Sequence, residues 1–63
     1  MMNLEIHAST NGPDDAQALA TWLEKIAKQI RKAGGDPVIE NGTAVQYTDD
    51  GPQDIHFDVN ASA

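Results

Sequence analysis

The stretch that decides the fold is PDDAQALATWLEKIAKQIRKAGG, residues 13–35. Pro13 needs no amide partner in the first turn of a helix, and either Asn11 or Gly12 can cap that turn. The glycine pair Gly34-Gly35 favours a left-handed stop at the other end. These signals predict a helix over residues 13–33.

An apolar stripe runs along one face of the predicted helix, at the spacing of a 3.6-residue repeat. Its members are Ala16, Leu19, Ala20, Leu23, Ile26, Ala27 and Ile30. A face this broad can lie flat on a sheet. The same region also fits an a/d seam, which is short for an independent coiled coil. Trp22 falls at the rim of the stripe, where it either closes the edge of the core or serves as an exposed aromatic anchor for a partner.

Two segments outside the helix alternate apolar and polar residues with the period of a half-buried strand. They cover about residues 3–9 and about residues 54–60. The apolar members are Leu4, Ile6 and Ala8 in the first segment and Ile55, Phe57 and Val59 in the second.

Between the helix and the last strand, Asn41-Gly42 supplies the two positive-φ residues of a type I′ turn. Residues 37–48 are therefore predicted to form a hairpin, and Asp-Asp-Gly-Pro at 49–52 forms the next turn. The predicted fold is α+β, a single β-α-β-β(-β) domain. One long amphipathic helix packs on one face of a small, mostly antiparallel sheet of three or four strands.

Length and composition narrow the classes of function. The chain has 63 residues, 40% of them hydrophobic, and no cysteine, which suits one small globular domain and excludes a disulfide scaffold or thiolate zinc site. No apolar run approaches the roughly 18 residues that span a bilayer. No secretory signal is visible either, so no membrane association is expected and the cytoplasm is the expected compartment.

Charge is distributed unevenly along the chain. There are ten acidic and four basic residues, and all four bases lie in the predicted helix, at Lys25, Lys28, Arg31 and Lys32. The acidic pair Asp14-Asp15 complements the positive end of the helix dipole. The second half of the chain is acidic and has no base; its acids are Asp36, Glu40, Asp49, Asp50, Asp54 and Asp58. Solvated turns account for such a pattern, but it also favours binding to a basic protein surface rather than to nucleic acid directly.

Two further surfaces are candidates for contacts. Trp22 and Tyr47 are the candidate aromatic anchors. If Ile39 and Ala44 face away from the helix, they form a patch on the uncovered sheet face that a second copy could cover, giving a homodimer.

A histidine–carboxylate cluster is the one candidate for chemistry. If the first and last strands are neighbours, His7 and His56 converge with acids of the same strands, where they could bind a metal or transfer protons. The acids are Glu5, Asp54 and Asp58. A solvated sheet face explains the same residues, and no phosphate-binding, nucleophile or metal motif is present. No metal site and no cofactor are predicted.

Three resemblances bear on function. In length and in its opening strand and helix, the chain resembles the 4-oxalocrotonate tautomerase family, but Met1-Met2-Asn3 replaces the N-terminal proline that is the base of those enzymes. Its layout is similar to that of dodecin subunits, although the strand after the helix has no tryptophan to stack on a flavin. In size, acidity and lack of motifs it resembles small phage-encoded anti-CRISPR proteins.

The leading hypothesis is therefore a non-enzymatic acidic protein-binding module. It would act as an inhibitor that blocks a basic, nucleic-acid-binding surface of another protein. One alternative is a homo-oligomeric structural or small-ligand-binding subunit. The other is a small acid-base or metal-dependent enzyme that uses His7 and His56.

Overall fold

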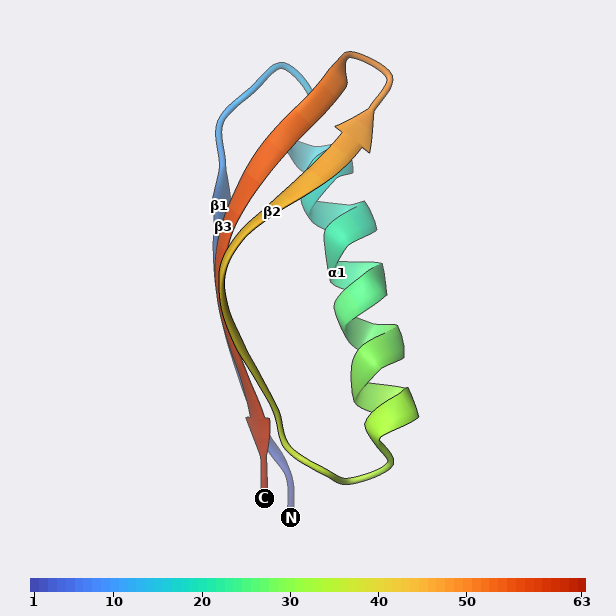
Figure 1. Ribbon diagram of the computed structural model, residues 1–63, viewed down its shortest axis with the longest axis vertical. Coiled ribbons are helices and arrows are strands. Elements are labelled where there is room, and N and C mark those ends of the chain that lie inside the picture. Colours follow the sequence, from blue (N-terminus) through green and yellow to red (C-terminus); the bar gives the residue numbers. More distant parts are fainter.

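One helix lies against one face of a curved, three-stranded sheet (Figure 1). The computed structural model describes residues 1–63. The elements follow the order β1 (Asn3–Thr10), α1 (Asp15–Ala33), β2 (Val38–Thr48) and β3 (Gly51–Ser62). β3 is the central strand, and β1 and β2 both pair with it antiparallel. The predicted α+β class and the predicted helix-on-sheet arrangement are confirmed.

The helix starts later than predicted and ends where predicted. Its N-cap is Asp14, which makes no side-chain capping hydrogen bond, so neither Asn11 nor Gly12 caps it. At the other end Gly34 adopts the left-handed conformation, with φ 62°, and its backbone N–H donates to the Arg31 carbonyl. A glycine can adopt this φ without the steric penalty that a side chain would bring.

The predicted hairpin at Asn41-Gly42 is wrong. β2 is one continuous strand, and all of its residues pair in register with β3. A type I′ turn needs positive φ at both central residues, but only Gly42 has one, at 137°. The sheet therefore has three strands rather than four, and an uninterrupted ladder outweighs the local turn preference of the dipeptide.

The chain reverses instead at Asp49-Asp50, inside the stretch predicted as the second turn. The Thr48 hydroxyl stabilises this reversal: it accepts from the Asp50 backbone N–H at 3.1 Å and donates to the Gly51 carbonyl at 3.0 Å. Gly51, with φ 107°, adopts the left-handed conformation that the turn requires.

The register decides which side chains face the helix, because residues directly opposite in a ladder share a face. Ile6 lies opposite Val59, and Ala44 lies opposite the fully buried Ile55 and packs against the core. Ala44 therefore faces the helix, contrary to the proposed open-face patch. Ile39 lies on the open face as proposed and is 63% exposed.

Trp22 lies at the centre of the core and not at its rim. It is 5% exposed, and its ring centroid is 5.3 Å from that of Phe57 in a tilted arrangement. The neighbouring Leu23 is 47% exposed. The helix is thus rotated from the predicted orientation, because burying the larger tryptophan removes more apolar surface from water.

The core is small for an elongated molecule. Only nine of 63 residues are buried, and the molecule measures 38 × 17 × 15 Å. The central cluster is Ala18, Trp22, Ile26, Ile55 and Val59. Stability therefore depends on few buried side chains, of which Trp22 is the largest.

Replacing Trp22 with alanine should unfold the protein. Truncating a buried tryptophan costs about 3–5 kcal/mol, and a core in a chain of this size supplies about the same amount in total. Circular dichroism of Trp22→Ala should show loss of the helical signal at 25 °C, and Trp22→Phe should fold with a lower urea midpoint. Leu23→Ala is the control, because it truncates an adjacent side chain that is half exposed. Equal stability of Trp22→Ala and Leu23→Ala would contradict the assigned core.

Candidate functional site

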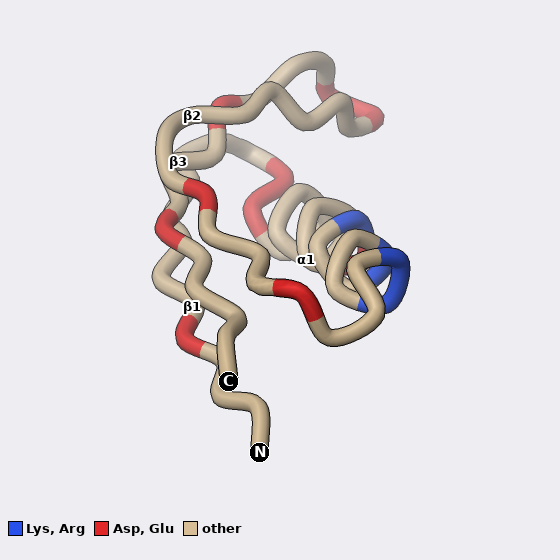
Figure 2. Tube along the Cα trace, turned by 60° about the horizontal axis from the view of Figure 1, so that its bottom comes forward, with Lys and Arg blue, Asp and Glu red and all other residues tan.

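Half of the ten acidic side chains gather at one end of the molecule. The start of α1 and the β2–β3 turn lie together there, at the top of Figure 1. We call this group the acidic end; its members are Asp14, Asp15, Asp49, Asp50 and Asp54. The basic residues lie in the half of α1 that leads to its C-terminus (Figure 2). The long molecule is therefore electrically polarised.

A buried glutamine, Gln53, ties the acidic end together. Its side-chain amide nitrogen donates to Thr10 Oγ1 at 2.9 Å and to Asp15 Oδ1 at 2.8 Å. Thr10 Oγ1 in turn donates to the Asp54 backbone carbonyl at 2.6 Å. One side chain of β3 thus joins the end of β1 to the start of α1 and leaves no buried polar atom unpaired.

Gly12 makes room for this glutamine. A Cβ at position 12 would lie 2.6 Å from Cδ of Gln53, closer than real contacts allow. The Gln53 amide can therefore keep its position under the loop between β1 and α1 because residue 12 has no side chain.

A second glutamine completes a polar layer at this end of the core. Gln46 on β2 pairs directly with Gln53 and is 6% exposed. Its Oε1 accepts a hydrogen bond from Lys25 Nζ at 2.9 Å, and its Nε2 donates to the Tyr47 carbonyl at 3.2 Å. The two glutamines thus connect α1 to two strands through directional contacts, which fix where the helix starts relative to the turn.

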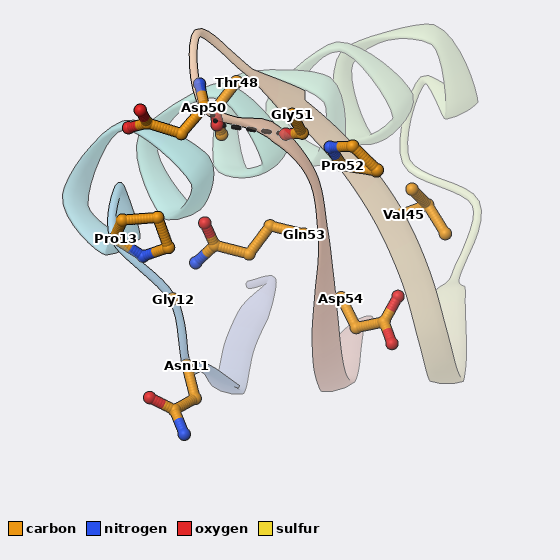
Figure 3. Close-up of a pocket in the computed structure, with 10 residues that line it drawn as sticks. All are labelled: Asn11, Gly12, Pro13, Val45, Thr48, Asp50, Gly51, Pro52, Gln53 and Asp54. Carbon is orange, nitrogen blue, oxygen red and sulfur yellow. Dashed lines mark hydrogen bonds between the residues drawn. The ribbon is translucent and has the colours of Figure 1, made fainter.

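A depression of about 380 Å³ opens between the loop after β1 and the β2–β3 turn. Figure 3 shows Asp50 and Asp54 on opposite sides of it, with Gln53 between them. Val45 is the one hydrophobic residue among the ten that line it. Carboxylates on a polar, open surface suit an ammonium or guanidinium group better than an apolar ligand.

The carboxylates of the acidic end repel one another. The pKa of Asp14 is raised above its usual value of 3.8, first by desolvation and then by the charge of Asp50 and a hydrogen bond with its side chain. The charges of Asp49 and Asp15 raise it further. Desolvation and the neighbouring carboxylates thus both disfavour the charged form of Asp14.

The structure divides the six acids that the sequence singled out. Asp49, Asp50 and Asp54 lie at the acidic end. Asp36 follows the helix at the far end of the molecule, and Glu40 and Asp58 lie along the middle of the sheet. Two members of the acidic end, Asp14 and Asp15, were assigned by sequence only to the helix dipole. The sequence signal for this grouping is the acidic turn at residues 49–50. It becomes informative only when the fold shows that this turn lies next to the start of α1.

The two candidate aromatic anchors differ in their exposure to solvent. Trp22 is buried against Phe57, so it presents no surface to a partner and cannot be an anchor. Tyr47 is 74% exposed on the open face, directly opposite Pro52, which lines the depression. Tyr47 therefore remains a candidate.

The histidines lie on the open face, and β1 and β3 are neighbours. His7 is directly opposite Asp58, Ser9 is opposite His56, and His56 Nδ1 is 3.1 Å from Thr43 Oγ1. A shallow depression of about 230 Å³ runs between the histidines. No group of three or more His, Cys, Asp or Glu side chains is placed to hold a metal ion.

Comparison of this chain with protein-family models, with curated protein sequences and with solved structures finds no match. The helix α1 falls short of the length and apolar character that crossing a membrane requires.

Removing the amide contacts of Gln53 should loosen the acidic end. Gly12→Ala forces the Gln53 side chain away from Thr10 and Asp15, which should lower the free energy of unfolding by about 1–3 kcal/mol. Urea denaturation measures this loss. In a Gln53→Ala background the same change at Gly12 should have little further effect, because the obstructed side chain is gone. An equal loss in both backgrounds would contradict the role assigned to Gly12.

The raised pKa of Asp14 predicts a pH dependence of stability. The folded state binds this proton more readily than the unfolded chain, so the contribution of Asp14 is full below its usual pKa of 3.8. It is lost as the pH rises through the raised pKa. Asp14→Asn cannot titrate, so its melting temperature relative to wild type should increase from acid to neutral pH. Asp36→Asn, with the same charge change at the far end, is the control. A relative melting temperature of Asp14→Asn that falls over this range would contradict the prediction.

Proposed function

We propose that this chain is a non-enzymatic binding module whose acidic end docks into a basic, nucleic-acid-binding groove of another cytoplasmic protein and blocks it. The observation that carries the proposal is the concentration of five carboxylates, with no base among them, at one narrow end of the molecule.

Electrostatics favours an end-on approach. A basic groove attracts the acidic end and repels Lys28, Arg31 and Lys32, which lie toward the C-terminus of α1, at the other end of the 38 Å long axis. Such a polarised charge distribution orients the molecule before contact and raises the association rate. The cross-section of 17 × 15 Å is narrow for a protein, which suits insertion into a groove.

The depression supplies the local contact. Asp50 and Asp54 can each accept hydrogen bonds from a guanidinium or ammonium group, and a carboxylate can accept an arginine through two parallel bonds. Arginine and lysine are the side chains that phosphate-binding grooves present, so a carboxylate cluster competes for the same donors. Tyr47, exposed beside Pro52, adds an aromatic surface next to the depression.

A second candidate function, a homo-oligomeric subunit, rests on a separate observation. Three large apolar side chains on β2 are exposed on the open face; they are Ile39, Val45 and Tyr47. Their exposed fractions are 63%, 52% and 74%. A second copy could cover this row of side chains.

The test is competition with nucleic acid. Proteins captured by the tagged chain from host lysate at low salt are purified and loaded with a labelled DNA duplex. Fluorescence anisotropy then measures displacement of the duplex by this protein. We expect displacement at low salt that weakens strongly at high salt, because the contacts are between exposed charges.

Two variants of equal net charge separate the acidic end from overall acidity. The triple change Asp49→Asn, Asp50→Asn and Asp54→Asn should weaken displacement by about tenfold or more. The control, Asp36→Asn, Glu40→Gln and Asp58→Asn, removes three charges elsewhere and should retain most activity. Displacement that is independent of salt, or equal loss in both variants, would contradict docking through the acidic end.

A further inference from the structure

The edge strand β1 lacks the features that normally protect a sheet edge. Its outer side has no neighbouring strand, since β1 pairs only with β3 (Figure 2). Over Asn3–Thr10 it contains no proline, glycine or lysine. Such an edge presents free backbone N–H and C=O groups that can pair with another strand. The other edge strand, β2, is continuous but contains Gly42, whose φ of 137° is unusual for a strand.

The apolar side of β1 is also incompletely covered. Leu4, Ile6 and Ala8 lie on the face that carries the helix, since they pair with Ala61, Val59 and Phe57. Leu4 is nevertheless 54% exposed, and Ile6 is only half-buried. β1 therefore has apolar surface that no other element of the chain covers.

The helix adds apolar surface on the same side. Lys25 reaches Gln46 on β2, so the opposite flank of α1 faces the β1 side. Leu23 is two residues from Lys25 and therefore lies on that opposite flank. It is 47% exposed, so a second apolar side chain is exposed on the side of the free edge of β1.

The sequence of β1 is complementary to itself. In an antiparallel pairing centred on Ile6, Glu5 lies opposite the partner's His7, and this contact occurs twice by symmetry. On the other face, Leu4 lies opposite the partner's Ala8 and Ile6 lies opposite the partner's Ile6. A carboxylate thus faces an imidazole on the polar side, and apolar groups meet on the helix side.

Neighbouring registers lose this match. A pairing centred on Glu5 places two carboxylates directly opposite each other, and one centred on His7 places two imidazoles opposite each other. A shift that pairs odd with even positions brings the polar face of one strand against the apolar face of the other. Charge complementarity therefore selects the pairing centred on Ile6.

We propose that two copies of this chain pair through β1 to form a two-fold symmetric dimer with a continuous six-stranded sheet. The antiparallel arrangement places the two acidic ends at opposite ends of the assembly, so their like charges do not oppose association. The dimer would present two acidic ends that point in opposite directions. This inference stands independently of the partner proposed above.

Sedimentation equilibrium of the full chain over a range of concentrations tests the proposal. We expect wild type to reach twice the monomer mass of 6.8 kDa as concentration rises. His7→Glu places like charges opposite each other at both symmetric contacts and should raise the dimer dissociation constant at least about tenfold. The double variant Glu5→Lys with His7→Glu restores opposite charges across the interface and should restore the dimer. Circular dichroism of each variant verifies that the fold is retained.

Two controls distinguish this edge from other surfaces. His56→Glu makes the same charge change on β3, away from the free edge, and should leave the dimer intact. Ile39→Glu disrupts the apolar row on the open face and should also leave it intact. A wild-type chain that is monomeric at every concentration would overturn the proposal. So would a dimer that persists in His7→Glu and is lost in Ile39→Glu.

Discussion

The contact of Trp22 with Phe57 is the interaction on which the rest of this structure depends. A single helix must cover one face of a three-stranded sheet, and only one large aromatic on that helix points into the sheet. Because Trp22 packs against Phe57, the rotation of α1 about its own axis is fixed. Ala18 and Ile26 are then buried, and Leu23 remains half exposed. The same rotation directs Lys25 toward β2 and Asp15 toward β3, where their partners Gln46 and Gln53 lie.

The hydrogen bonds of these two glutamines define the position of the helix on the sheet, which the apolar contact alone leaves free. Apolar burial is non-directional, and a core of this size would tolerate sliding of the helix along the sheet. Hydrogen bonds from Gln53 to Thr10 and Asp15 hold the helix start next to the β2–β3 turn. The position of the acidic end is thus a consequence of buried polar contacts, which Gly12 permits by leaving space for Gln53.

Local signals in the sequence predicted the elements well, and long-range pairing decided what they missed. Gly34 ends the helix as predicted, and the strand alternation around Ile6 and Ile55 is present, because each of these signals is read within a few residues. Asn41-Gly42 failed as a turn because continuous pairing with β3 outweighs a dipeptide preference. The broad apolar stripe left the rotation of the helix undetermined, so Trp22 was placed at the rim. Asp14 was missed as a neighbour of Asp50, and Asp15 as a partner of Gln53, because only the tertiary fold brings these residues together.

The acidic end also carries a stability cost that the fold itself does not require. Gln53 needs one carboxylate acceptor, which Asp15 supplies, whereas Asp14 and the turn acids lie together without a base. The pKa of Asp14 is raised first by desolvation and then by repulsion from Asp50, Asp49 and Asp15. Solvent screens this repulsion at the surface, but it opposes folding and does not favour it. Surfaces that retain destabilising charge are commonly functional ones, and a cationic partner would relieve this repulsion on binding. The same reasoning favours an antiparallel dimer, which adds apolar contacts at β1 and keeps the two acidic ends apart.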